Sequence, residues 1–479
     1  MKRAKQMKLL LGILAVVSIM AFAVLSYQEK QEDIQNTDEV ILQIDADSVT
    51  ELSWTYDDTS LSFHKETKWQ YDDDEAFPVD AEKIESLLSY FSEMGAAFVI
   101  EDAEDLTQYG LDDPECSVYI HSNDKDYEIA FGDYSIMDAQ RYVSIGDGNV
   151  YLVNSDPLAA FQVELSDMID NDDIPTFDRV DSISFSGSEN YEVIYKEYSE
   201  DSTDTICSED IYYKKENETL LPLDTENVEL YLDTISGMSE DSYVTYNASE
   251  EDLATYGLDD PELTVDISYS DDDENEEETT KNFTLHISRD AETKQTVEEN
   301  NGTNDESDNN EEVSDNEEKT YAYARIGNSK IIYKISETSF DALMAASYDD
   351  LRHKNLFTGD FSDISQIDVE LDGKQYSINV ESDGGENTYL YNDKEIDITD
   401  SRTALEAVSA TSFINDASED DQELSLTLHF SNETNNTMSL TFYRYDGENC
   451  LAEVNGKITA LVSRSAVIDL SEAINAIVL

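Results

Sequence analysis

One stretch of sequence occurs twice in this chain, and that repeat constrains the fold more than any other feature. Residues 105–120 read DLTQYGLDDPECSVYI, and residues 252–267 read DLATYGLDDPELTVDI. Chance does not produce a match of that length and quality. Because self-similarity at a fixed offset indicates a repeated structural unit, the chain is predicted to contain tandem copies of one module.

The match extends upstream into a predicted helix in each copy. Asp80 and Asp224 each follow a proline by two residues and stand before a stretch with apolar residues at helical spacing. An aspartate in that place is a preferred N-cap, because its carboxylate accepts hydrogen bonds from the free N–H groups of the first turn. The apolar stripes consist of Ile84, Leu87, Leu88 and Phe91 in the first copy and of Val228, Leu232 and Ile235 in the second.

Alternating apolar and polar residues follow the repeated stretch and predict strands, and each copy then closes with a short helical pattern. The first copy is expected to have strands at 117–121, 127–131, 142–145 and 150–153 and a helix at 157–168. The second copy is expected to have strands at 264–269, 283–287, 321–326 and 331–335 and a helix at 339–348.

A third, more divergent copy fills the C-terminal part, although it lacks the YGLDDP element. Gly456 in EVNGKITALVS has the place of Gly327 in RIGNSKIIYKIS and of Gly146 in SIGDGNVYLVN. A turn between two strands that needs a permissive backbone therefore recurs three times. The predicted elements are strands at 364–371, 376–380, 424–430, 440–443, 451–454 and 458–462 and helices at 403–408 and 466–477.

These patterns predict an α+β protein with three tandem β-rich modules, each a mainly antiparallel sheet with one or two packed helices. The modules are expected at residues 38–175, 176–357 and 358–479. A tract of Asp, Glu, Asn, Ser and Thr at about residues 289–319 has almost nothing to bury. It is therefore predicted to be a disordered acidic insertion in a hairpin loop of the second module.

The N-terminus differs sharply from the rest of the chain. Residues 1–8 are rich in Lys and Arg, and residues 9–27 form an apolar segment without charge. This order predicts one transmembrane signal-anchor in the cell membrane, with a cytoplasmic N-terminus and an extracytoplasmic bulk. The small residues around Ala23 leave a second interpretation open, in which the segment is a signal peptide that is cleaved near Ala23 and the protein is secreted.

The composition argues against several classes of function. The chain has 110 Asp and Glu against 29 Lys and Arg, a formal net charge of −81, which repels nucleic acid and anionic headgroups. We therefore expect no nucleic-acid partner and only non-specific attraction of cations to the acidic surface. The three cysteines, Cys116, Cys207 and Cys450, are widely spaced and form no Cys-x-x-Cys, which argues against a disulfide framework and a metal knuckle.

No catalytic or cofactor motif is recognisable in the sequence, since Gly-x-Ser-x-Gly, a P-loop and Gly-x-Gly-x-x-Gly are all missing. A zinc site assembled from distant copies stays open as an alternative. We otherwise expect no enzyme and no cofactor, and we nominate no catalytic, cofactor-binding or metal-binding residue. The histidines, which form no cluster along the chain, are His64, His121, His286, His353 and His429.

The YGLDDP element has a structural and a functional interpretation. In the structural one, Gly110 and Gly257 take a left-handed conformation, Leu111 and Leu258 enter the core, and Asp-Asp-Pro starts a strand. In the functional one, the carboxylates hold a hard cation, although the short turn supplies too few ligands for calcium. Those carboxylates are Asp112, Asp113, Glu115, Asp259, Asp260 and Glu262.

Aromatic and thiol side chains of the strands allow the same two interpretations. Trp54 and Trp69 could form a carbohydrate-stacking platform, but aromatic residues of alternating strands more often form the core. Cys116 aligns with Leu263 of the second copy, so it is expected to be a small core residue and not a nucleophile. His429 lies between two apolar residues of a strand and is expected on the polar face.

The chain resembles a known family. The Trp69-bearing strand, the Pro-x-Asp helix start, the YGLDDP turn and the stretch YDDLRHKNLF at residues 348–357 are similar to proteins catalogued as domain of unknown function 4340. The resemblance covers most of residues 40–357. It implies an N-terminal membrane anchor and a link to ABC-type export systems of the gliding-motility auxiliary kind, and it supplies no catalytic residues.

Together these features favour a non-enzymatic extracytoplasmic accessory or scaffold subunit of a membrane assembly, with the membrane and ABC-type transporter subunits as its expected partners. The alternative is a cell-surface binding module for a glycan, a peptide or a divalent cation.

Overall fold

The computed structural model describes residues 39–478 except positions 124, 138 and 241 and the segments 200–203, 272–278, 295–320, 384–385, 415–420 and 432–436. The predicted membrane segment at residues 9–27 and most of the predicted insertion at 289–319 lie outside this part of the chain. None of the described helices is long and apolar enough to cross a membrane. The chain divides into two compact units between Asp172 and Asp173.

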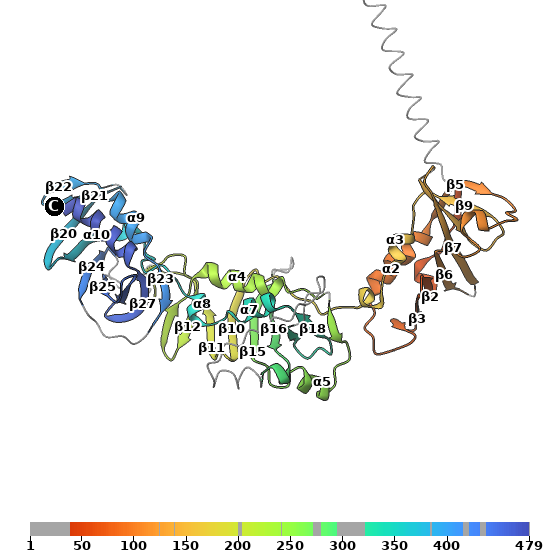
Figure 1. The fold of residues 1–479 in the computed structure, drawn as a ribbon, viewed down its shortest axis with the longest axis horizontal. Helices are drawn as coiled ribbons and strands as arrows, with labels where there is room; N and C mark the ends of the chain where they lie inside the picture. The colour runs from red at the N-terminus through yellow and green to blue at the C-terminus, as the bar shows by residue number, and fades with distance from the viewer. Residues whose placement is uncertain are drawn as a thin grey trace, which may run out of the picture. The chain divides into compact units, whose positions relative to one another are not determined.

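The first unit contains one nine-stranded antiparallel sheet, with the order β4-β3-β2-β6-β7-β8-β9-β5-β1 (Figure 1). Its strands are β1 (Glu39–Leu42), β2 (Val49–Tyr56), β3 (Thr59–Lys65), β4 (Trp69–Tyr71), β5 (Met94–Ile100), β6 (Cys116–Ser122), β7 (Lys125–Ser135), β8 (Gln140–Ser144) and β9 (Val150–Val153). Its helices are η1 (Ala46–Ser48), α2 (Ala81–Ser92), η2 (Thr107–Tyr109), α3 (Leu158–Phe161) and η3 (Leu165–Met168).

The second unit begins with another nine-stranded antiparallel sheet, with the order β13-β12-β11-β10-β15-β16-β17-β18-β14. Its strands are β10 (Val180–Gly187), β11 (Tyr191–Tyr195), β12 (Tyr212–Glu216), β13 (Thr219–Pro222), β14 (Tyr243–Thr245), β15 (Leu263–Asp271), β16 (Thr279–Ser288), β17 (Ala322–Ile326) and β18 (Ile332–Ile335). Its helices are α4 (Thr225–Ser236), α5 (Glu250–Thr255), α7 (Glu337–Met344) and α8 (Tyr348–Leu351).

A third nine-stranded antiparallel sheet completes the second unit, with the order β22-β21-β20-β19-β24-β25-β26-β27-β23. Its strands are β19 (Ile364–Leu371), β20 (Lys374–Asp383), β21 (Glu386–Tyr391), β22 (Lys394–Ile396), β23 (Ala410–Phe413), β24 (Gln422–Phe430), β25 (Thr437–Arg444), β26 (Asn449–Val454) and β27 (Lys457–Ser463). Its helices are η4 (Phe361–Asp363), α9 (Thr399–Glu406) and α10 (Arg464–Val478).

The three sheets share one topology. When the strands of the second sheet are numbered along the chain, their spatial order is 4-3-2-1-6-7-8-9-5, and the third sheet has the same order. The first sheet follows the same order with two differences. Near the place of the fourth strand it has only an isolated bridge, Val79 to Ile169, and it adds β1 outside β5. The threefold repeat of a mainly antiparallel module is thereby confirmed, including the divergent third copy.

The predicted N-caps are confirmed. The carboxylate of Asp80 accepts hydrogen bonds from the N–H groups of Glu82 and Lys83, and that of Asp224 accepts from Glu226. Beyond the caps, the helices bury equivalent stripes. These are Ile84, Leu87, Leu88 and Phe91 in α2 and Val228, Tyr231, Leu232 and Ile235 in α4.

The predicted closing helices were too long. The helix predicted at 157–168 is broken into α3 and η3, because the backbone at Gln162 leaves the helical region. The helix predicted at 339–348 ends at Met344, and Ser347 caps the separate helix α8. The helix predicted at 403–408 begins earlier, at Thr399, whose N–H donates to the Asp397 carboxylate.

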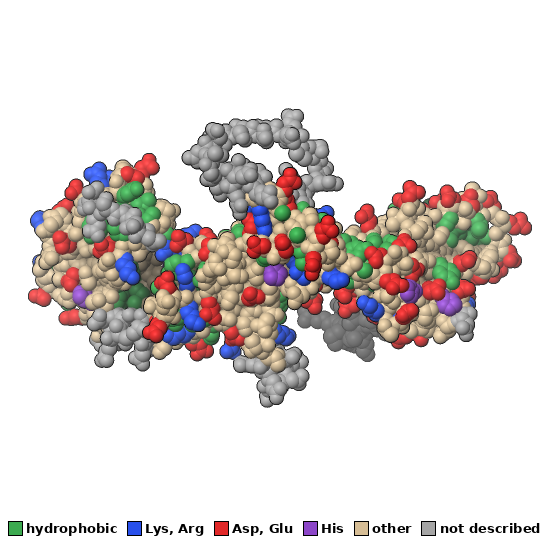
Figure 2. Space-filling model, turned by 90° about the horizontal axis from the view of Figure 1, so that it is seen from below, with side chains coloured by type: hydrophobic (Ala, Val, Ile, Leu, Met, Phe, Trp, Pro, Cys, Tyr) green, Lys and Arg blue, Asp and Glu red, His purple; other side chains and the backbone are tan. Residues whose placement is uncertain are grey.

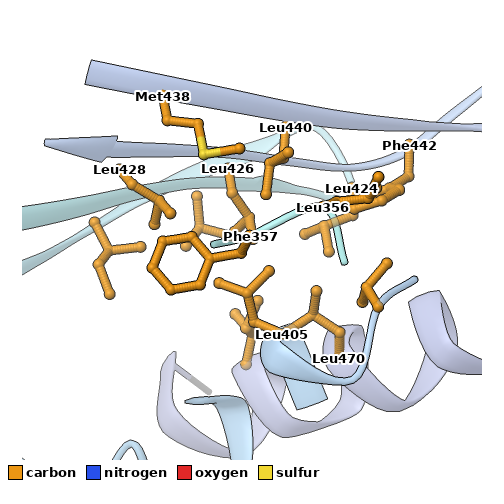
Figure 3. Close-up of a cluster of buried hydrophobic side chains, with 14 of the residues drawn as sticks. Leu356, Phe357, Leu405, Leu424, Leu426, Leu428, Met438, Leu440, Phe442 and Leu470 are labelled. Atoms are coloured by element: carbon orange, nitrogen blue, oxygen red, sulfur yellow. The ribbon is translucent and has the colours of Figure 1, made fainter. Parts of the chain in front are cut away.

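The core of the third sheet shows how the layers meet. Figure 3 shows side chains of α9 and α10 directed toward side chains of β24 and β25, so the helices cover one face of the sheet. Phe357, from the segment that enters this module, lies between them and is 4% exposed. The labelled residues are Leu356, Phe357, Leu405, Leu424, Leu426, Leu428, Met438, Leu440, Phe442 and Leu470.

Candidate functional site

Within the described residues, one group of Cys, His and acidic side chains is close enough to hold a metal ion. It consists of Cys207, Asp210 and His353, whose ligand atoms all lie within 4.8 Å of one another. A second carboxylate, that of Asp224, contacts the far nitrogen of His353. We call these four residues the junction cluster, because they lie where the second sheet continues into the segment that leads to the third.

The loop between β11 and β12 supplies Cys207 and Asp210. In the first sheet the equivalent strands β3 and β4 are joined by residues 66–68 alone, so this loop at 196–211 is an addition of the second module. Thr205 holds both residues in this loop. The Thr205 hydroxyl accepts a hydrogen bond from the Cys207 N–H at 2.9 Å and donates one to Asp210 Oδ2 at 2.5 Å. The hydroxyl of the fully buried Tyr213 donates to the Asp210 carbonyl at 3.0 Å.

His353 lies two residues after the end of α8, and both of its ring nitrogens face carboxylates. Nε2 lies 2.7 Å from Asp210 Oδ1, and Nδ1 lies 3.3 Å from Asp224 Oδ2. Asp224 is held in place as the N-cap of α4, and its own N–H donates to the Leu351 carbonyl at 3.0 Å. An imidazole that faces carboxylates on both sides is suited to carry a proton on each nitrogen.

The charges of the cluster agree with that protonation state. Burial alone lowers the pKa of His353, but the hydrogen bonds and charges of Asp210 and Asp224 outweigh it, and the pKa is raised. Asp210 is 1% exposed, so its carboxylate depends on these partners in place of water. In the absence of a metal, the imidazole thus lies between two carboxylates that favour its protonated form.

The thiol of Cys207 is not prepared for nucleophilic attack. Burial and then the negative charge of Asp210 raise its pKa to about 11. A reactive cysteine needs the opposite, a pKa lowered toward neutrality by nearby positive charge. A cavity of about 460 Å³ opens beside the cluster and is lined by all four of its residues and by Glu226 and Phe357.

The YGLDDP turns have the structural role. Gly110 and Gly257 have φ of 66° and 71°, and Leu111 and Leu258 are buried. Asp112, Asp113, Asp259 and Asp260 are exposed. The two glutamates pair with arginines: Glu115 contacts Arg141 Nη1 at 3.2 Å, and Glu262 contacts the guanidinium of Arg289. Arg289 is the first residue of the predicted insertion and belongs to its described part.

The remaining histidines lie apart from the junction cluster. His64 pairs with Asp72 at 2.5 Å and His121 with Asp126 at 2.6 Å. His429 pairs with Asp368 at 2.8 Å, which confirms its place on the polar face of its strand. His286 contacts the Thr264 hydroxyl at 3.0 Å.

The tryptophans and the other two cysteines belong to the cores. Trp54 and Trp69 are 2% and 3% exposed, and Trp54 stacks on Phe63 with ring centroids 5.6 Å apart, so they form no carbohydrate platform. Cys116 and Cys450 are fully buried, and burial raises the pKa of each thiol to about 12.

Two of the sheets have a polar hollow at the same place on the face away from the helices. In the first, a cavity of about 560 Å³ includes Ser53 and its neighbours across the ladder, Ser62 and Tyr119. In the third, a cavity of about 380 Å³ includes Asp368 with Ser377 and Thr427, at equivalent positions. Acidic side chains are spread over the visible surface and are not gathered at one hollow (Figure 2).

The sequence did not indicate the junction cluster, because its members come from three separate segments. Asp210 and His353 are 143 residues apart. Cys207 is part of no Cys-x-x-Cys, and the loop that carries it has no counterpart in the first copy. The available signals were the Cys-x-x-Asp spacing in that loop and the position of His353 in the stretch 348–357.

Comparison with known proteins identifies one family. The family model described as Domain of unknown function (DUF4340) matches residues 69–205 and 215–427. The match thus continues beyond residue 357 into the third module. No curated protein and no solved structure matches the chain.

Proposed function

The chain belongs to the DUF4340 family, and on that premise we propose that it is a non-enzymatic extracytoplasmic scaffold or accessory subunit of a membrane assembly. The proposed assembly is an ABC-type transporter. The residues 9–27 would hold the chain in the membrane, and the three modules would stand outside it.

The observation that supports this proposal is the recurrence of one sheet topology three times. Each copy covers one face of a sheet with helices, and repeated units of that kind serve to present surface. The chemistry of the junction cluster fits the same role. Its thiol is protonated at neutral pH, and its imidazole is held between Asp210 and Asp224.

The direct test is co-purification from native membranes. The full-length chain with a C-terminal tag would be cross-linked in cells, extracted in mild detergent and analysed by mass spectrometry. We expect an ATPase and a membrane-embedded subunit of one transporter to be recovered together. Recovery of the chain without any membrane protein would contradict the proposal.

A matched variant makes that test sharper. The substitutions Ile13→Arg and Val17→Arg should prevent stable insertion of residues 9–27 into the membrane, since each arginine costs about 3 kcal/mol at the centre of a membrane span. The chain should then leave the membrane fraction and lose its partners, whereas Ile13→Leu should retain both. Partners that persist on the released chain would assign the contact to the modules and not to the anchor.

The second candidate is a surface binding module for a glycan or a peptide, which the equivalent polar hollows of the first and third sheets favour. A ligand that binds the folded state raises the melting temperature. Glycan and peptide panels should therefore shift the transition of the wild type and not that of a Ser53→Leu, Asp368→Leu double variant. Equal shifts in both proteins would argue against these hollows as the site.

A further inference from the structure

We propose that the junction cluster binds one zinc ion, or a similar divalent transition metal, through Cys207 Sγ, Asp210 Oδ1 and His353 Nε2. The inference rests on these side chains alone and does not depend on the transporter proposal. Thiolate, imidazole and carboxylate are the three donor types that zinc takes in proteins.

The distances suit a zinc site that forms by small side-chain movements. The three ligand atoms lie within 4.8 Å of one another. Ligands of a tetrahedral zinc lie about 3.3–3.8 Å apart, given metal–ligand distances of about 2.0–2.3 Å. His353 Nε2 and Asp210 Oδ1, now 2.7 Å apart, would therefore separate slightly.

The surroundings of the three ligands have the features of a built site. Asp224 Oδ2 faces His353 Nδ1 at 3.3 Å, and a carboxylate in that place fixes the tautomer that directs Nε2 at a metal. Thr205 donates to Asp210 Oδ2, so Oδ1, which now contacts His353 Nε2, is the oxygen that would turn to the metal. Asp210 is 1% and Cys207 8% exposed, so the donors are already removed from bulk water.

The fourth position is available on the cavity side. The cavity of about 460 Å³ borders all four residues of the junction cluster and has room for a water molecule as the fourth ligand. Binding needs Cys207 as the thiolate and His353 Nε2 without a proton, so the thiol proton and any proton on Nε2 pass to solvent.

Zinc at this place would join two separate parts of the chain. Cys207 and Asp210 belong to the loop at 196–211, in which Ile206 packs against the core of the third module. His353 belongs to the segment that carries Leu356 and Phe357 into that same core. The metal would therefore fasten the added loop to the connection between the second and third sheets.

The test is a zinc and cobalt titration of the purified full-length chain. Excess Mg²⁺ would occupy the acidic surface, which attracts any cation. We expect one equivalent of Zn²⁺ to bind above that background and to raise the melting temperature. Co²⁺ should give a thiolate-to-cobalt charge-transfer band that Zn²⁺ abolishes.

Variants assign the site. Cys207→Ser and His353→Gln should remove the cobalt band or weaken zinc binding by at least about 10-fold, and Asp224→Asn, which keeps an N-cap, should weaken it about 10–100-fold. Cys450→Ser is the matched control and should bind as the wild type does. Melting curves without metal would show which variants fold.

Two outcomes would overturn the proposal. One is a wild-type chain that binds no Zn²⁺ above the Mg²⁺ background or shows no thiolate band with Co²⁺, a result that needs no variant to fold. The other is zinc binding that Cys207→Ser and His353→Gln leave unchanged, which would place the ion on the acidic surface.

Discussion

The first and second modules begin their capped helices in the same way. In the first, the N–H of Asp80 donates to the carbonyl of Met168 at 2.9 Å. In the second, the N–H of Asp224 donates to the carbonyl of Leu351 at 3.0 Å. Each module thus has a backbone hydrogen bond between the start of its helix and the end of its own sequence, and the first module adds a second, from the Asp170 N–H to the Pro78 carbonyl.

The two modules differ directly beside that shared bond. Two residues after Met168 stands Asp170, whereas two residues after Leu351 stands His353. Only the second module has the loop that brings Asp210 to the imidazole. The repeated elements thus maintain the fold, and the distinctive chemistry arises where the second copy adds a loop and places a histidine beside the shared N-cap.

The largest expected effect concerns an equivalent core position of the two helices. Phe91 of α2 and Ile235 of α4 are both fully buried, and Phe91 packs against the rings of Phe131 and Phe161. Phe91→Ala should cost about 4 kcal/mol and Ile235→Ala about 3 kcal/mol, because each leaves a cavity in proportion to the side chain removed. Regional hydrogen exchange would report the two losses separately.

Those losses should stay confined to their own modules. Phe91→Ala should accelerate exchange in β2 and β6 and leave β10 and β15 unchanged. Faster exchange throughout the chain would show that the modules unfold together, and the comparison between independent copies would then fail.

The next effect concerns the YGLDDP turns. A Cβ on Gly257 would lie 2.4 Å from the Arg289 carbonyl, and one on Gly110 would lie 2.9 Å from the Asp133 nitrogen. Alanine there adds a clash to the cost of a positive φ, and each substitution should destabilise its module by about 3 kcal/mol. Denaturant unfolding followed by regional hydrogen exchange would measure both values.

Gly456 is the control for that pair. It has φ of 78°, but a Cβ there would meet nothing within 4 Å. Gly456→Ala should therefore cost only about 1–2 kcal/mol, the price of the left-handed backbone. Equal losses at all three glycines would show that close contact adds nothing at the YGLDDP turns.

The N-cap residues test the difference between the copies. Asp80→Ala should cost about 1 kcal/mol, the usual value for a lost cap. Asp224→Ala should cost about 2 kcal/mol, because it also removes the carboxylate that faces His353. Thermal unfolding with a chelator present would measure both without a contribution from metal.

Asparagine at the same positions separates the two contributions. Asp80→Asn keeps the cap and should change stability by less than about 0.5 kcal/mol. Asp224→Asn keeps the cap but loses the charge beside the imidazole, so its loss should lie between those of the wild type and Asp224→Ala. If Asp80→Ala and Asp224→Ala were equally destabilising, His353 would contribute nothing to the second module.

Much of the fold could be predicted because its signals are local. The caps Asp80 and Asp224 precede apolar stripes, and the buried Leu111 and Leu258 lie within one recognisable turn. The predicted elements nevertheless omit several strands. The edge strands β14 and β23, of three and four residues, are too short to hold a periodicity. The longer β5 and β10, of seven and eight residues, were also missed, although their length would allow one.

The junction cluster could not be predicted from the same signals. Alignment of the copies draws attention to what they share, whereas Cys207 and Asp210 lie in a loop that the first copy lacks. His353 is brought to that loop by the closing of the module and not by any spacing along the chain. Such a site depends on tertiary placement, which a single sequence does not reveal.

The smallest expected effect is a difference in pH dependence between two strand histidines. The hydrogen bond to Asp72 raises the pKa of His64, whereas burial and then the charge of Arg325 lower the pKa of His286. The pKa of His64 is 6.5 in the unfolded chain and higher in the folded one. His64 should therefore stabilise the first module below pH 6.5, and this stabilisation should fade as the pH rises through the folded pKa.

His286 should behave in the opposite sense. Because its folded pKa lies below 6.5, the second module should keep its full stability above that pH and lose some of it as the pH falls through the lower folded value. NMR titration of the two imidazole rings would measure the pKa values, with His64→Gln and His286→Gln to assign the signals. Two values on the same side of 6.5 would contradict the inference that these strands surround their histidines differently.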